Sequence, residues 1–250
     1  MSKILDYHLS LNEQLKVPFK VYKEKRTSWR ISVTKNGAIL RVPQFFNNTE
    51  IENKISWSKD WLTKQFLRKP TLQSSFSKKN FVTGDSITII GKEYIIKVDS
   101  GLSSNRLTAK VVGSEIHIIC PDLEDGIKVD AIAKLLSRLT AQIAKAYIHK
   151  RVHDINEVYF KKSITNIRFK YNSSNWGSCS SKSNINLSTR LLLAPIPVID
   201  YVIIHELSHL VHMNHSDKFW SLVGSIMPGY KHHEKWLKVN SHLCDFRSKA

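Results

Sequence analysis

Residues 205–215 contain two histidines with the spacing H-E-x-x-H inside an apolar run. Residues i and i+4 lie on one face of a helix, so His205 and His209 can direct their rings at one ion. Imidazole is a preferred zinc ligand, and Glu206 is then placed beside the ion as a general base. The alternative is an ordinary amphipathic helix that carries two of the chain's 11 histidines by chance.

A catalytic zinc site needs a third protein ligand and an open position for water. His212 lies on the same face, but seven residues rise about 10.5 Å along a helix, too far for bonds of about 2.1 Å. His215 fits if the helix ends first, since Asn214 tolerates a left-handed cap and Ser216 can begin a new helix. The other candidates are Glu234 and the pair His232-His233.

The N-terminal half, which precedes the elements that position the histidines, is rich in predicted strands. Alternating apolar residues predict a β-hairpin over residues 18–43, and Thr49 with Glu52 predicts a capping box that opens a helix. Residues 71–80 form a polar linker. A second hairpin is predicted over 86–98, with strands near 106–111 and 115–120, and no repeat is evident beyond the two hairpins.

The C-terminal half favours helices around a small sheet. Helical periodicity spans residues 128–150, and strands are expected at 164–170 and 184–193 on either side of a turn at residues 176–178. Helices over about 216–227 and 230–244 follow the histidine helix. The order predicts an α+β fold, with a β-rich accessory region at 1–122 and a metal-binding domain at 123–250. The strand around 185–192 is a candidate for pairing with an extended peptide.

Composition indicates a soluble globular protein, with 42% hydrophobic and 24% charged residues. Three cysteines, no apolar segment of signal-peptide length and no apolar run near about 18 residues favour a cytoplasmic protein without a membrane span. The net charge of +17 is either a solubility feature or an attraction to nucleic acid or acidic proteins.

Several short motifs stand in a fixed order between about residues 165 and 240. They are Trp176-Gly177-Ser178-Cys179-Ser180, Asn184-Ile185-Asn186-Leu187, Leu192-Leu193-Ala194-Pro195, Val198-Ile199-Asp200-Tyr201, the H-E-x-x-H segment, Asn214-His215-Ser216, Phe219-Trp220, Met227-Pro228 and Trp236-Leu237. Together they resemble the YgjP-like metallopeptidases, which are similar around the site to SprT-like proteases. The resemblance implies a zincin-like fold, zinc ligands His205, His209 and His215, and Glu206 as the catalytic base.

The residues and the resemblance predict a zinc metallopeptidase that acts on a peptide or protein substrate. The alternative is a basic nucleic-acid-associated module in which zinc is structural, and a DNA-associated protease would combine the two. A structural zinc site is usually closed by a fourth ligand, for which Cys179 is the candidate, although a packed thiol is the simpler interpretation. Candidate donors to an oxyanion are Tyr230, His232 and His233.

Overall fold

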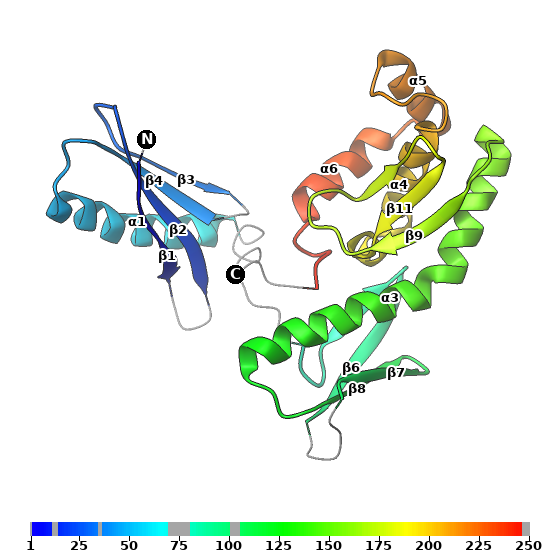
Figure 1. Ribbon diagram of the computed structural model, residues 1–250, viewed down its shortest axis with the longest axis horizontal. Helices are drawn as coiled ribbons and strands as arrows, with labels where there is room; N and C mark the ends of the chain where they lie inside the picture. The colour runs from blue at the N-terminus through cyan, green and yellow to red at the C-terminus, as the bar shows by residue number, and fades with distance from the viewer. Residues whose placement is uncertain (1, 12–14, 35–36, 70–80, 101–105, 247–250) are drawn as a thin grey trace. The chain divides into compact units, whose positions relative to one another are not determined.

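The computed structural model describes residues 2–11, 15–34, 37–69, 81–100 and 106–246 (Figure 1). Two compact units divide the chain, one of residues 1–79 with 247–250 and one of residues 80–246. Helices and sheets occur in both, so the predicted α+β class is confirmed. The expected functional division into 1–122 and 123–250 stays a prediction, and the linker at 71–80 lies outside the described residues.

The first unit is a four-stranded sheet followed by a helix. The strands are β1 (Ser2–Ser10), β2 (Lys16–Glu24), β3 (Arg30–Thr34) and β4 (Gly37–Pro43), and the helix is α1 (Asn48–Arg68). The sheet order is β1-β2-β4-β3, with β2 parallel to β4 and the other pairs antiparallel. The β3–β4 pair confirms the first predicted hairpin, whose turn residues 35–36 lie outside the described ranges.

The helix α1 begins two residues earlier than predicted. Its cap is Asn47, whose Oδ1 accepts a hydrogen bond from the Glu50 amide at 2.9 Å, while the Glu50 carboxylate accepts one from the Asn47 amide at 2.7 Å. The predicted box of Thr49 and Glu52 is therefore wrong. Both pairs have the required spacing, and the earlier one satisfies the first exposed amides of the helix.

The second unit opens with the same arrangement. Its strands are β5 (Ser86–Ile89), β6 (Lys92–Ser100), β7 (Thr108–Val112) and β8 (Glu115–Cys120), in the order β5-β6-β8-β7, and α3 (Asp125–Ile155) follows. The second hairpin and both later strands are confirmed. β6 is parallel to β8 and the outer pairs are antiparallel, as in the first unit. The repeat is thus a whole ββββα module. The sequence showed only the two hairpins, because the order in which strands pair in a sheet cannot be read from residue types.

The rest of the second unit surrounds a three-stranded sheet. After the π-helical turn η1 (Asn156–Phe160) come β9 (Asn166–Lys170), β10 (Gly177–Cys179), β11 (Asn184–Ser188) and the 3₁₀ turn η2 (Thr189–Leu193). The helices are α4 (Ile196–Ser208), α5 (Asp217–Ile226) and α6 (Tyr230–Asn240). Among the described residues, no helix is both long and apolar enough to cross a bilayer.

Two expectations about this sheet are wrong. The region at 176–178 contains strand β10, and the strand expected at 184–193 ends at Ser188, where the chain turns into η2. The sheet order is β10-β11-β9, so β11 already has a neighbour on each side. A peptide cannot add to residues 185–192, because only the outer strands β9 and β10 present an unpaired edge in this sheet.

A buried guanidinium ties the C-terminal segment to the chain that leads into β10. Arg190 donates to the carbonyl of Cys244 at 2.8 Å and to that of Ser173 at 3.0 Å. It also forms an ion pair with Asp245 at 3.2 Å, and its guanidinium lies 4.7 Å from the ring centre of Trp176. Both charged side chains are almost fully buried, so their pairing is required for either to be tolerated there.

Replacing Asp245 with Asn should lower the free energy of unfolding by about 3–5 kcal/mol, because the guanidinium of Arg190 would remain buried without its counter-charge. The matched control is Asp154→Asn, which breaks an exposed pair with Lys150 and should cost less than about 1 kcal/mol. Urea unfolding of both variants measures the difference. Equal losses would contradict the role assigned to the buried pair.

Candidate active site

Helix α4 carries two of the three histidines and ends sooner than its sequence indicates. The last helical residue is Ser208, and His209 occupies the C-cap with a helical backbone, so its ring still follows that of His205. The next amides bond three residues back, with Leu210 donating to Leu207 at 3.0 Å. These tight turns lead the chain away from the helix axis.

The third histidine returns to the first two across this bend. Nε2 of His215 lies 3.0 Å from Nε2 of His205, and the ligand atoms of His205, His209 and His215 all lie within 4.8 Å of one another. The expected left-handed cap at Asn214 is wrong, since its φ is not positive, and the Ser216 side chain makes no cap hydrogen bond. The 3₁₀-type turns produce the bend that a left-handed residue was expected to make.

The other candidate ligands lie elsewhere. Among the described residues that group contains the three histidines and neither His212, Glu234 nor Cys179. His212 instead offers its carbonyl oxygen to Nδ1 of His209 at 3.1 Å. Glu234 accepts a hydrogen bond from Lys238 at 2.6 Å. His232 is exposed, and the ring centre of His233 lies 6.3 Å from that of Tyr201.

The histidine group fits a tetrahedral metal ion. Bonds of about 2.0–2.1 Å place two ligand nitrogens about 3.3 Å apart, close to the 3.0 Å between His205 and His215. A proton on Nδ1 of His209, donated to the His212 carbonyl, leaves Nε2 available as the ligand atom. Burial, together with the neighbouring imidazoles, lowers the pKa of His205 to about 4, so its ring is neutral, as coordination requires.

Aromatic packing holds the three imidazoles in place. The fully buried ring of Phe219 lies 4.9, 4.6 and 4.8 Å from the ring centres of His205, His209 and His215. Trp220 stacks on His215 at 5.6 Å. The sequence contained both residues only as part of a motif, because their role depends on how α5 packs against the bend after α4.

Glu206 is buried beside this group. Its side chain is 5% exposed, and burial raises the pKa of its carboxyl to about 8. A methyl group at Gly177 would lie only 2.6 Å from Oε1 of Glu206, so β10 passes as close to the carboxylate as a glycine permits. Burial, with the nearby Glu206 charge, also raises the pKa of the Cys179 thiol to about 11, which fits a packed thiol.

A series of stacked rings begins at His215 and includes residues of α5, α6 and α4. Tyr230 stacks on Trp220 at 5.5 Å and on Tyr201 at 6.2 Å. Of the three candidate donors to an oxyanion, Tyr230 is therefore the one that the structure brings into contact with the aromatic residues next to His215. The sequence contained Tyr201 only as part of a motif, and this residue lies one turn before His205 on α4.

The family model that matches the chain is the YgjP-like metallopeptidase domain, over residues 27–240. The chain belongs to this family. No curated protein shows significant sequence similarity to this YgjP-like metallopeptidase. Among solved structures, the chain is similar to the metallopeptidase zymogen of Pyrococcus abyssi abylysin. The two sequences are 21% identical, the match covers 36% of this chain and 92% of that chain, and the TM-score is 0.34. The corresponding zymogen of Methanocaldococcus jannaschii jannalysin is 26% identical, covering 38% and 96%, with a TM-score of 0.33.

In the YgjP-like metallopeptidase, Gly177→Ala should lower kcat for peptide hydrolysis about 10–100-fold while metal content stays unchanged. The added methyl displaces the Glu206 carboxylate and leaves the histidines in place. Gly177 has no positive φ, so the effect is steric. Gly229→Ala is the control, since its methyl would lie 4.0 Å from its nearest neighbour, Nδ1 of the exposed His232. Wild-type turnover in Gly177→Ala would show that the close approach has no role.

The raised pKa of Glu206 predicts how the metal-free enzyme responds to pH. Between the ordinary value of 4.5 and about 8, the carboxyl is ionised in the unfolded chain and protonated in the folded one, so folding must take up a proton. The contribution to stability is therefore complete below 4.5 and is lost as pH rises through about 8. We expect Tm of the chelator-treated wild type to fall more than that of Glu206→Gln between about pH 6 and 9. The lowered pKa of His205 also adds a slope until the ring of the unfolded chain is neutral, above its ordinary value of 6.5, but it does so equally in the two proteins. Parallel curves for the two proteins would contradict the burial of the carboxyl.

Proposed function

We propose that this metallopeptidase hydrolyses peptide bonds at one zinc ion held by His205, His209 and His215, with Glu206 as the general base. The observation that supports it most is the convergence of three histidine nitrogens next to the buried carboxyl of Glu206. Zinc would supply an acidified water and a Lewis acid for the scissile carbonyl. Three ligands leave a position open for that chemistry, whereas structural zinc sites are usually closed by four.

The protein's own part in the reaction is the transfer of a proton. Glu206 would take the proton of the attacking water on its carboxylate and return it to the leaving amine. A carboxyl whose pKa is raised toward neutrality is a stronger proton acceptor than an exposed one. A bound cation would lower that pKa again, so the same group remains ionised at neutral pH when the metal site is filled.

Substrate alignment follows from the position of β10. Gly177 places this outer strand in contact with Glu206, and its other edge is unpaired within the sheet. An extended peptide that pairs with β10 through backbone hydrogen bonds would pass directly by the carboxylate. Tyr230 is the proposed donor to the oxyanion, on the basis of its ring contact with Trp220.

A reducing compartment such as the cytoplasm agrees with three free thiols, of which Cys120 and Cys244 are buried. The alternative in which zinc is only structural is disfavoured, because Cys179 does not join the three histidines.

Glu206→Gln should keep full zinc occupancy and lose about 10³-fold or more in hydrolysis, since its amide cannot accept the proton. A pooled peptide library analysed by mass spectrometry measures cleavage without a known substrate, and elemental analysis measures zinc. His215→Ala should lose zinc and activity together, while Glu234→Ala should keep its zinc. Wild-type cleavage by Glu206→Gln would reject the mechanism, and zinc loss in Glu234→Ala alone would transfer the third ligand to Glu234.

A further inference from the structure

One face of α1 carries two neighbouring indole rings with cations on either side. Its residues follow one another at intervals of three and four, which places them along a single side of the helix. They are Lys54, Trp57, Trp61, Lys64 and Arg68. The buried side of the helix includes Ile51, Leu62 and Phe66, and the half-buried Trp61 also packs against this core. Trp57 is 44% exposed, and Lys64 and Arg68 are exposed.

A third indole from outside the helix completes this surface. Trp29, just before β3, contacts Trp57 edge-on at 4.8 Å, and the ammonium of Lys54 lies 4.8 Å from the Trp29 ring centre. Trp57 and Trp61 are nearly parallel, with 19° between their planes. We name these six residues the tryptophan–lysine stripe: Trp29, Lys54, Trp57, Trp61, Lys64 and Arg68.

The positive charge of the chain is concentrated in the unit that bears the stripe. Residues 1–79 contain 16 Lys and Arg against six Asp and Glu, whereas residues 80–246 contain 20 against 15. Some of the few carboxylates are already used within the unit, since Glu24 pairs with Arg26 and Arg41. An anionic partner is therefore attracted to this unit first.

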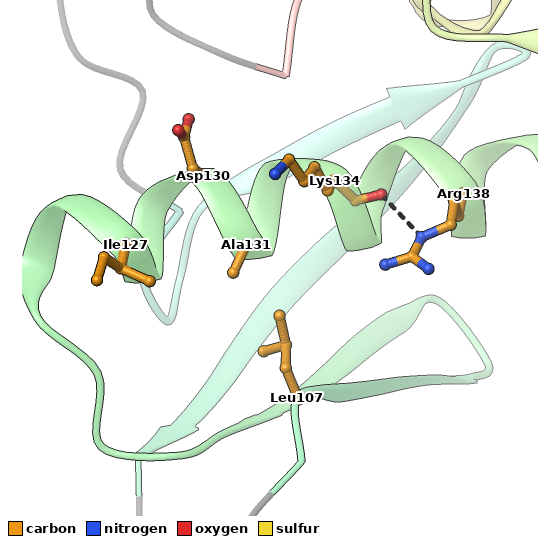
Figure 2. Close-up of a pocket in the computed structure, with 6 residues that line it drawn as sticks. All are labelled: Leu107, Ile127, Asp130, Ala131, Lys134 and Arg138. Atoms are coloured by element: carbon orange, nitrogen blue, oxygen red, sulfur yellow. Dashed lines mark hydrogen bonds between the residues drawn. The ribbon is translucent and has the colours of Figure 1, made fainter.

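The repeated module supplies a comparison within the same chain. Helix α3 occupies the place that α1 has in the first copy, and it also carries two cations four residues apart, Lys134 and Arg138. These two line a hollow with Leu107 and Ile127, in which Arg138 donates to the Lys134 carbonyl at 3.4 Å (Figure 2). No tryptophan occurs in α3. The tryptophans are thus a property of the first copy and not a requirement of the fold.

We propose that the tryptophan–lysine stripe binds single-stranded nucleic acid. The exposed indole of Trp57, with the half-buried rings of Trp29 and Trp61 beside it, offers a surface on which unpaired bases stack. The flanking cations pair with the phosphates that link successive bases. A duplex hides its base faces, and an acidic peptide has no planar groups to place on the indoles, so neither uses both halves of the surface. Binding is indifferent to base sequence, because stacking and phosphate contacts carry little sequence information.

The test uses the full-length protein and a fluorescent oligothymidylate, with fluorescence anisotropy at two salt concentrations. Trp57→Ala should weaken binding about tenfold or more, and Trp57→Phe, which keeps an aromatic face, should restore most of it. The double variant Lys64→Gln/Arg68→Gln should weaken binding and reduce the salt slope by about 1.4, the value for two lost phosphate contacts on a single strand.

The matched control is Lys134→Gln/Arg138→Gln, which removes the same charge at the same spacing from the helix without tryptophans. Its affinity should stay within about twofold of wild type. If both charge variants weaken binding equally and Trp57→Ala has no effect, the attraction is general charge and the stripe is not a site. Stronger binding of polyglutamate or duplex DNA than of the oligothymidylate would also overturn the proposal. Peptidase activity of these variants is expected to be unchanged, so this outcome is separate from that of the zinc mechanism.

Discussion

The contact between Glu206 and strand β10 is the constraint around which this peptidase is arranged. A buried carboxyl has lost most of its water, and ionising it there is unfavourable unless a cation lies nearby. The neighbouring His205, whose pKa burial lowers to about 4, adds no such charge, so a bound metal ion is the group that would offset the unfavourable burial. Metal binding and the ionisation of Glu206 are therefore coupled, because each would favour the other in the same buried space.

Residues outside the site hold the surroundings of Glu206 in position. Arg151 of α3 donates two hydrogen bonds to the Asp200 carboxylate, at 2.8 and 2.7 Å, and so anchors α4 one turn before His205. On the other side, Arg190 holds the chain next to Trp176, immediately before Gly177. Two arginines thus fix the helix and the strand between which the carboxylate lies, and neither belongs to the chemistry itself.

The parts of the structure that the sequence predicted are those set by local pattern. The pairing of His205 with His209 follows from helical spacing alone, and the β3–β4 hairpin from alternation and a tight turn. Strand β10 was missed because three small or polar residues have no strand pattern, and they are held by pairing with β11. The packing of Phe219 among the three imidazoles is likewise tertiary. No local propensity indicates that a residue four positions after His215 will contact rings on the preceding helix.

The repeated ββββα module has a consequence for how the chain can change over time. Among the residues that the structure describes, the buried core of the first copy runs from Leu9 to Phe66, and that of the second unit begins at Ile87. In the described residues, the strands and helix of the second copy contribute to the core that also contains the apolar residues of α4, the helix that bears His205. The core of the first copy contains no residue of α4. Substitutions on the surface of this copy can be selected for a partner while the catalytic half keeps its sequence, as in a duplicated gene of which one copy retains the original task.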